Sequence, residues 1–224
     1  MVGRKSKGSS RSRRGSSSTS RAQWQSTYEQ TPYDQLPWFE PGPSVGVQRA
    51  VDEGFLPKGG EVLDIGCGAG SNVLFLAERG YHAHGIDLSP GAVAAARSRA
   101  KSAHLTIDVQ EGDALALAFP DGSLDALIDN GCFHTLPLSR REQYAREVHR
   151  VLRAHGSVVL SWVAREHTAS RGPPHRPSLG EVTALFESRF LFVRTGFHLP
   201  SEDGDPPTYF AFLSRRSARY PPPR

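Results

Sequence analysis

Short apolar runs alternate with segments of helical character along most of the chain. The apolar runs predict strands over residues 61–65, 82–86, 105–110, 124–129 and 157–163. The segments before and between them predict helices over residues 43–55, 70–79, 89–102 and 139–153. Strands that alternate with helices in this way indicate an α/β fold, in which a mostly parallel sheet carries helices on both faces.

Capping residues mark several of the expected helix ends. Ser89 followed by Pro90 is typical of a helix start, and Ser139 predicts the N-cap of a later helix. Gly80 predicts the end of the helix that follows the first strand.

The alternation breaks down near the end of the chain. A helix is predicted over residues 179–188, and two apolar runs follow at 191–196 and 209–214. Because no helical segment separates these runs, we expect an antiparallel pair joined by a turn at 199–207.

Composition narrows the class of protein. Hydrophobic residues make up 38% of the 224, and no apolar run approaches the roughly 18 residues that a transmembrane helix needs. Two cysteines exclude a disulfide scaffold and a four-cysteine zinc site. We expect a single domain over residues 22–216, between a basic tail at 1–21 and a proline-rich tail at 217–224.

Positive charge is concentrated in the basic tail, which holds seven basic side chains, eight serines and no acid. Such a segment has too little apolar surface to fold, so we predict that it is disordered. Removing these seven from the chain's 27 basic groups leaves 20 against 23 acidic ones, a net charge of −3. The tail lacks the apolar stretch of a secretory signal, which favours a cytoplasmic protein. It is interpreted as a solvated extension or, alternatively, as an electrostatic arm for RNA, DNA or acidic surfaces.

Acidic residues stand at the carboxyl ends of four expected strands, which is where open α/β sheets bind their ligands. The first strand ends at Asp64 and leads into a glycine-rich loop, and the next three end in Asp87, Asp113 and the pair Asp129-Asn130. Glycines let the backbone of such a loop turn sharply and approach a ligand closely. The four strand ends together predict a ligand-binding site.

The glycine-rich loop does not suit a pyrophosphate. The dinucleotide-binding pattern requires a glycine where this chain has Ser71, and the loop contains no Arg or Lys, while Asp64 attracts a cation. A carboxylate at Asp87 is placed to accept both hydroxyls of a ribose, and Asp113 is placed to accept an adenine amino group. The pattern therefore favours a ligand with adenine, ribose and a positive, phosphate-free end. S-adenosylmethionine (SAM) fits that description.

Three motifs resemble those of the class I SAM-dependent methyltransferases. They are residues 62–70 (VLDIGCGAG), 85–89 (GIDLS) and 112–114 (GDA), and the resemblance extends over roughly residues 33–214. It implies a Rossmann-like, doubly wound sheet of seven strands in the order 3-2-1-4-5-7-6, with strand seven antiparallel.

The resemblance also implies roles for the motif residues. Gly66 and Gly68 would approach the methionine part of SAM, Asp87 the ribose, and Asp113 with Ala114 the adenine. The full set of expected cofactor-binding residues is Trp38, Asp64, Gly66, Cys67, Gly68, Gly70, Asp87, Leu88, Asp113, Ala114, Asp129 and Asn130.

Two further segments resemble a narrower group. Residues 36–43 (LPWFEPGP) are similar to the Pro-Trp segment before the core of thiopurine, thiol/halide and tellurite-resistance methyltransferases. Here Phe39-Glu40 stands where that group has Asp directly after the Trp. Residues 129–136 (DNGCFHTL) resemble the segment after strand four in related small-molecule methyltransferases. We therefore expect a small-molecule methyl acceptor, without nucleic acid, membrane or metal, and a monomeric protein.

Methyl transfer by in-line displacement requires the protein mainly to align the reactants and exclude water. A thiolate acceptor needs little help, whereas a phenol or amine needs a general base. His134 is the candidate base, and the alternative is a histidine hydrogen-bonded within its loop; Cys132 is expected to be a packing residue. We expect the aromatic segment 22–42 to close as a lid, with Trp38 facing the sulfonium through cation–π attraction. Alternatively, it staples the N-terminus onto the core.

Three other functions stay open. A nucleic-acid methyltransferase would use the basic tail, but an amino-base methylase is expected to carry Asn/Asp-Pro-Pro-aromatic after strand four, where this chain has DNGC at 129–132. Ser71 disfavours a nicotinamide-dependent oxidoreductase. For a catalytically silent binding module, the strand-end acids argue against loss of cofactor binding but not against loss of methyl transfer. The polar connection at 164–178 either shapes an acceptor pocket or is a solvated loop.

Overall fold

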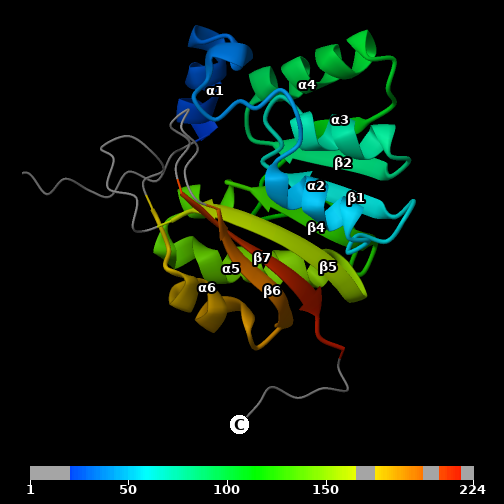
Figure 1. Ribbon diagram of the computed structural model, residues 1–224. Coiled ribbons are helices and arrows are strands. Elements are labelled where there is room, and N and C mark those ends of the chain that lie inside the picture. Colours follow the sequence, from blue (N-terminus) through cyan, green and yellow to red (C-terminus); the bar gives the residue numbers. More distant parts are fainter. Residues whose placement is uncertain (1–20, 165–174, 199–206, 218–224) are drawn as a thin grey trace, which may run out of the picture.

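A seven-stranded sheet forms the centre of the molecule in the computed structural model, which describes residues 21–164, 175–198 and 207–217 (Figure 1). Its strands are β1 Glu61–Ile65, β2 His82–Asp87, β3 Asp108–Glu111, β4 Leu124–Asn130, β5 Leu152–Val163, β6 Phe190–His198 and β7 Thr208–Arg215. They lie in the order β3-β2-β1-β4-β5-β7-β6. The first five strands run parallel, whereas β7 pairs antiparallel with β5 and β6. The expected fold, strand order and antiparallel strand seven are confirmed.

Helices cover both faces of this sheet. They are α1 Arg21–Gln30, α2 Val45–Asp52, α3 Ser71–Glu78, α4 Pro90–Ser102, α5 Leu138–Val151 and α6 Leu179–Phe186. Residues of α2, α3 and α4 pack with Val62 of β1 in one buried cluster, whereas residues of α5 and α6 pack with Leu63 in another. Because neighbouring strand residues point to opposite faces, the two clusters are the cores on either side of the sheet.

The capping signals identify the start of α4 correctly. Ser89 is its N-cap, with the Oγ accepting a hydrogen bond from the amide of Ala92 (3.4 Å), and Pro90 is the first helical residue. Ser178 caps α6 in the same way, in a reciprocal capping box with Glu181.

The expected N-cap of α5 is wrong by two residues. Pro137, not Ser139, is the N-cap, and α5 begins at Leu138. The proline holds φ at −64° with an extended ψ of 151°, so the helix starts directly after it.

Two strand limits also differ from those expected. The strand expected at 105–110 is β3 at 108–111, because the chain is still leaving α4: the amide of Leu105 donates to the carbonyl of Ala100 (2.9 Å). The fifth strand begins at Leu152 rather than at 157, because Leu152 already pairs with Leu124 before a register shift in the ladder.

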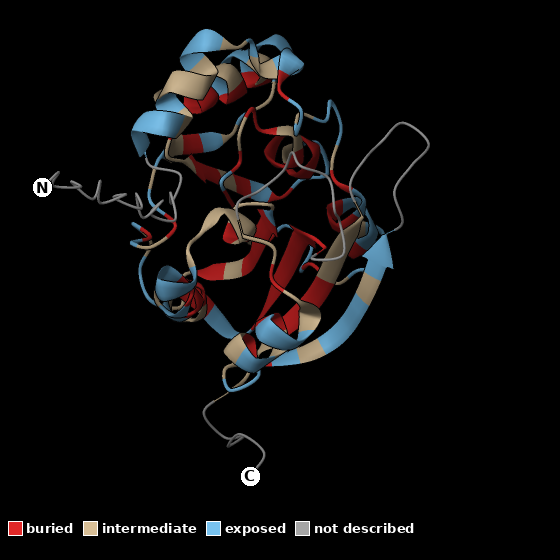
Figure 2. Cartoon of the chain, turned by 90° about the vertical axis from the view of Figure 1, so that its left-hand side faces the viewer, coloured by how far each residue is buried: buried red, intermediate tan, exposed pale blue. Residues whose placement is uncertain are grey.

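The helix α1 lies almost wholly in the aromatic segment 22–42, where we predicted no helix. None of its residues is buried, and it packs against α4. Figure 2 colours the chain by burial and shows many buried residues on the strands of the sheet. The residues of α1 favour helix without forming a repeated apolar stripe, so apolar periodicity has no signal there.

Several expected features fall wholly or mostly outside the described residues. These are the tails at 1–21 and 217–224, the connection at 164–178 and the turn at 199–207. Within the described part of the chain, no helix combines the length and apolar character needed to cross a membrane.

Candidate active site

The carboxyl ends of β1, β2, β3 and β4 meet at one edge of the sheet, because these strands are parallel neighbours. The loop after β1, residues 66–70, leads directly into α3. The amides of Gly66 and Cys67 both donate to the carbonyl oxygen of Ile86 on β2 (2.8 and 2.9 Å). These bonds hold the glycine loop against the end of β2.

Two glycines of this loop occupy positions that a side chain would disrupt. Gly66 has φ +69°, and a Cβ there would lie 2.7 Å from the Cβ of Cys132 in the loop after β4. Gly70 has φ +80°, and a Cβ there would lie 2.9 Å from the Cβ of Ala96 on α4. Glycine therefore serves two needs here, a left-handed backbone and close packing of the loop between its neighbours.

Asp87 ties the glycine loop to the end of β2. Its Oδ2 accepts a hydrogen bond from the amide of Gly68 (3.0 Å), and its Oδ1 accepts one from the amide of Ser89 (2.9 Å). Burial raises the pKa of Asp87, although these amides act in the opposite direction. Each carboxylate oxygen can accept a second hydrogen bond, and Leu88 beside it is half-buried.

The loop after β3 lies next to Asp87. The amide of Gly112 donates to the backbone carbonyl of Asp87 (3.0 Å), and the Oδ1 of Asp113 accepts from the amide of Leu115 (2.9 Å). Ala114, the residue after Asp113 in this loop, is buried. The structure thus brings the loop that holds Asp113 and Ala114 beside the end of β2, and the adenine contact of these residues stays a prediction.

Asp64 is a buried carboxylate at the base of the glycine loop. It is 1% exposed, the side chain of Asn72 hydrogen-bonds to it, and its Oδ2 has no hydrogen-bond partner among the described residues. Burial raises the pKa of Asp64 well above its ordinary value, and the nearby carboxylates of Asp129 and Asp87 add to the effect. Such an oxygen is costly to bury unless a cation or donor reaches it.

We expect Asp64→Asn to stabilise the cofactor-free protein by on the order of 1–3 kcal/mol near neutral pH. The native pKa of Asp64 lies above its unfolded value of about 3.9, so the native state binds the extra proton between the two values. Stability from this group therefore falls as pH rises through that window. Asn carries no charge, so the gain should be small near pH 4 and grow toward pH 7 in urea unfolding.

Asp125→Asn is the matched control for that experiment. Burial acts to raise the pKa of Asp125, but hydrogen bonds from the amide of Glu61 and from Arg153 lower it overall. The native carboxylate therefore adds stability as pH rises, and its loss should cost more at pH 7 than at pH 4. Slopes of the same sign for the two variants would contradict the account of Asp64.

Asp129 differs from the other strand-end acids, and its expected contact with the cofactor is not what the structure favours. It is 1% exposed, and its oxygens accept hydrogen bonds from the hydroxyl of Tyr144 (2.6 Å) and from the amides of Cys132 (2.9 Å) and Phe133 (3.0 Å). Burial raises its pKa to about 6, and these donors oppose the rise. The carboxylate closes the loop after β4, and only Asn130, at the exposed end of the strand, is open to a ligand.

The structure argues against His134 as a general base. Its Nδ1 accepts a hydrogen bond from the amide of Val163 (3.1 Å), so in the neutral ring the proton sits on Nε2. Burial lowers its pKa to about 3, with Arg141 and Arg176 adding to the effect. A ring whose only lone pair is already engaged does not accept a proton near neutral pH. Nearby, Cys132 packs against Gly66, as expected of a packing residue.

Tyr28 of α1 is the aromatic side chain set against the glycine loop. A Cβ on Gly68 would lie 3.0 Å from its hydroxyl, and one on Gly91 would lie 2.9 Å from its Cβ. Burial, with the carboxylate of Asp87, raises the pKa of Tyr28 to about 12. Trp38, expected in this place, is 49% exposed and reaches the site only through Nε1, 3.5 Å from the Tyr28 hydroxyl. Sequence reasoning missed Tyr28, because nothing in the sequence distinguishes it from the other aromatic residues of segment 22–42.

A glycine loop between β1 and α3, with carboxylates at the ends of β1 and β2 and just after β3, is the arrangement in which proteins of the doubly wound α/β type bind a ligand. Residues 62–156 match the family model described as a methyltransferase domain. A 2-heptyl-1-hydroxyquinolin-4(1H)-one methyltransferase of Mycobacteroides abscessus is 32% identical over 155 residues, which are 67% of each chain. The chain belongs to the class I SAM-dependent methyltransferases, and SAM is its cofactor.

Solved structures show the same fold. A protein studied for the conversion of a disulfide bond into a thioacetal group during echinomycin biosynthesis is similar with a TM-score of 0.75 and 23% identity, over 86% of this chain and 92% of that one. Magnesium protoporphyrin IX methyltransferase from Synechocystis, solved with bound S-adenosylhomocysteine (SAH), is similar with a TM-score of 0.63 and 20% identity, over 75% and 80% of the two chains.

Proposed function

We propose that this enzyme transfers the methyl group of SAM to a sulfur, nitrogen or oxygen atom of a small molecule by in-line displacement. The observation that carries the proposal is the pair of carboxylates Asp87 and Asp64. Asp87 retains acceptor capacity at the end of β2, and the Oδ2 of Asp64 has no partner in the described part of the chain. The ribose hydroxyls and the ammonium group of SAM are donors of the kind that these oxygens accept.

The residues around the glycine loop suit the remaining parts of the cofactor. Gly66 and Gly68 would lie along its methionine part, Asp87 and Leu88 at the ribose, and Asp113 with Ala114 at the adenine. When bound, SAM supplies a methyl group activated by a positively charged sulfur. The backbone of Cys67 and Gly70 shapes the loop, and Asn130 lies at the exposed end of β4 where the acceptor would approach.

The acceptor side of the site suits an atom that needs no base from the protein. His134 is neutral with its Nδ1 engaged, and Asp129 is occupied by Tyr144 and backbone amides. A thiolate or an acidic hydroxyl is already deprotonated near neutral pH, so alignment and exclusion of water suffice for transfer. The M. abscessus relative, named for a hydroxyquinolone, supports an acceptor of this kind.

The names of similar methyltransferases and the net charge of the chain beyond the basic tail both favour a small acceptor over nucleic acid. The magnesium protoporphyrin enzyme is also named for a small molecule. Beyond the basic tail the chain has a net charge of −3, which does not attract a polyanion. The narrower likeness to thiopurine, thiol/halide and tellurite-resistance enzymes stays a prediction from residues 36–43.

The test is transfer from methyl-labelled SAM to a panel of thiols, acidic phenols, hydroxyquinolones, aliphatic alcohols, amines and RNA. We expect labelling of a thiol or an acidic hydroxyl compound and none of aliphatic alcohols. The chain lacking residues 1–20, which removes six basic groups but leaves α1 intact, should have the same turnover. Turnover should also be flat between 50 and 200 mM salt, conditions under which nucleic-acid binding falls by orders of magnitude. Labelling of RNA that is lost on truncation would contradict the proposal.

A further inference from the structure

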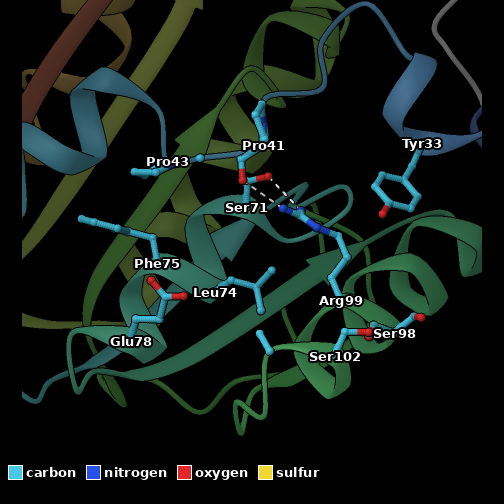
Figure 3. Close-up of a pocket in the computed structure, with 12 residues that line it drawn as sticks. Tyr33, Pro41, Pro43, Ser71, Leu74, Phe75, Glu78, Ser98, Arg99 and Ser102 are labelled. Atoms are coloured by element: carbon cyan, nitrogen blue, oxygen red, sulfur yellow. Dashed lines mark hydrogen bonds between the residues drawn. The ribbon is translucent and has the colours of Figure 1, made fainter.

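Arg99 of α4 joins two segments that lie far from it in the sequence (Figure 3). Its Nη1 donates to the carbonyl oxygen of Ala69 (2.7 Å) and to the hydroxyl of Ser71 (2.9 Å), both at the glycine loop. Its Nη2 donates to the carbonyl oxygen of Pro41 (3.0 Å), 58 residues away. One guanidinium thus binds the glycine loop and the segment before α2 together.

We name residues 33–43 the aromatic strap. Its rings flank the same guanidinium, with the Cζ of Arg99 5.1 Å from the ring centre of Phe39 and 5.8 Å from that of Tyr33. The hydroxyl of Ser71 also donates to the carbonyl oxygen of Glu40 in the strap. Burial lowers the pKa of Arg99, which nevertheless stays charged at any physiological pH.

The aromatic strap is connected to the residue that faces the glycine loop. Trp38 of the strap reaches the hydroxyl of Tyr28 through Nε1, and that hydroxyl lies against Gly68. The rings of Trp24 and Trp38 also meet edge to face, with centres 5.5 Å apart. A strap that lifts from α4 would therefore break the contact between Trp38 and the Tyr28 hydroxyl.

A surface groove of about 480 Å³ lies beside Arg99, lined by Tyr33 and Pro41 of the strap and by Ser71 and Leu74 of α3. The carboxylates of the candidate site are not among its lining residues. The groove therefore marks the seam between the strap and helices α3 and α4, apart from the carboxylates of the candidate site.

Resting on the proposed function, we propose that Arg99 is a positioning residue that keeps the aromatic strap seated on the glycine loop and thereby slows cofactor release. A planar guanidinium can hold Ala69, Ser71 and Pro41 at once while stacking on rings, whereas the single ammonium of lysine cannot. Loss of these contacts should let the strap lift more often, which raises the dissociation rate of the cofactor more than it lowers the association rate.

The test compares Arg99→Lys with Arg97→Lys. Arg97 lies on the same helix, and its Nε donates to the carbonyl oxygen of Val109 on β3 (2.9 Å). We expect Arg99→Lys to raise the dissociation rate of SAH about tenfold in stopped-flow measurements, as for the loss of one charge-assisted hydrogen bond. Acrylamide quenching of tryptophan fluorescence should also rise without ligand, because Trp24 and Trp38 move while Trp162 stays buried. Arg97→Lys should change neither.

Phe39→Leu removes the aromatic ring of the strap that lies against the Arg99 guanidinium. If Arg99 acts through the strap, the double variant with Arg99→Lys should release SAH no faster than the worse single variant, because interacting residues are not additive. Fully additive effects, or unchanged SAH release in Arg99→Lys, would overturn the inference. An equal loss of melting temperature in both lysine variants with no difference in quenching would also overturn it, since Arg99 would then only pack. Failure of the native chain to bind SAH in calorimetry would instead overturn the proposed function.

Discussion

Asp87→Ala should weaken SAM binding by about 10- to 150-fold, the equivalent of roughly 1.5–3 kcal/mol for hydrogen bonds to a charged group. The carboxylate holds the glycine loop through the amide of Gly68 and, under the proposed function, accepts the ribose hydroxyls. The cofactor-free protein should keep its melting temperature within a few degrees, because a buried carboxylate with a raised pKa contributes little net stability when charged. Isothermal titration calorimetry measures the affinity.

Asp87→Asn makes that experiment sharper. Both oxygens of Asp87 accept backbone N–H groups, from Gly68 and Ser89, so an amide NH₂ must face one of these donors. We expect Asn to be nearly as damaging as Ala despite its similar shape. Asp52→Ala removes an acid of α2 that makes an exposed ion pair with Arg79 (3.8 Å), and it should leave affinity unchanged. Native affinity in both Asp87 variants would place the ribose elsewhere.

Gly66→Ala is expected to destabilise the protein by about 2–5 kcal/mol, the sum of left-handed backbone strain and overpacking. Gly66 has φ +69°, and its added Cβ would lie 2.7 Å from the Cβ of Cys132, so either the glycine loop or the loop after β4 must move. Denaturant unfolding measures the stability. Cofactor affinity should fall as well in whatever fraction stays folded.

Substitutions at two other glycines distinguish the effect of backbone strain from the effect of overpacking. Gly54 has φ +69° but no atom within 4 Å of an added Cβ, so Gly54→Ala tests backbone strain alone, at about 1–2 kcal/mol. Gly42 has neither a left-handed φ nor a close neighbour, so Gly42→Ala should be neutral. If Gly66→Ala and Gly54→Ala cost the same, the contact with Cys132 is not what requires glycine at position 66.

Most of the fold could be predicted because its signals are local. Buried parallel strands appear as short apolar runs, such as 61–65 and 124–129, and Ser89-Pro90 marks a helix start on its own. The family resemblance then supplied the strand order. The start of β3 was missed because the turn after α4 has the left-handed residue His104 (φ 55°). A glycine at this position would have predicted the turn, but a histidine does not. The helix α1 was missed because its support comes from α4, not from its own apolar pattern.

The candidate site could be predicted only in part. Asp64, Asp87 and Asp113 lie where strand ends place them, and their convergence follows from the parallel sheet. The states of Asp129 and His134 could not be predicted, because they depend on the Tyr144 hydroxyl and the Val163 amide. Both partners come from elements that follow later in the chain.

The sequence by itself determined the strand and helix order, the glycine loop and the row of strand-end acids, because each of these features depends on residues that are close together in the chain. Only the tertiary structure decided which acids keep free acceptor capacity, that Tyr28 and not Trp38 lies on the loop, and that Arg99 joins Ala69 to Pro41. Hydrogen-bond partners and burial arise between segments tens of residues apart. A carboxylate in sequence is the same whether it will face a cofactor or a buried tyrosine, and the packing around it makes the difference.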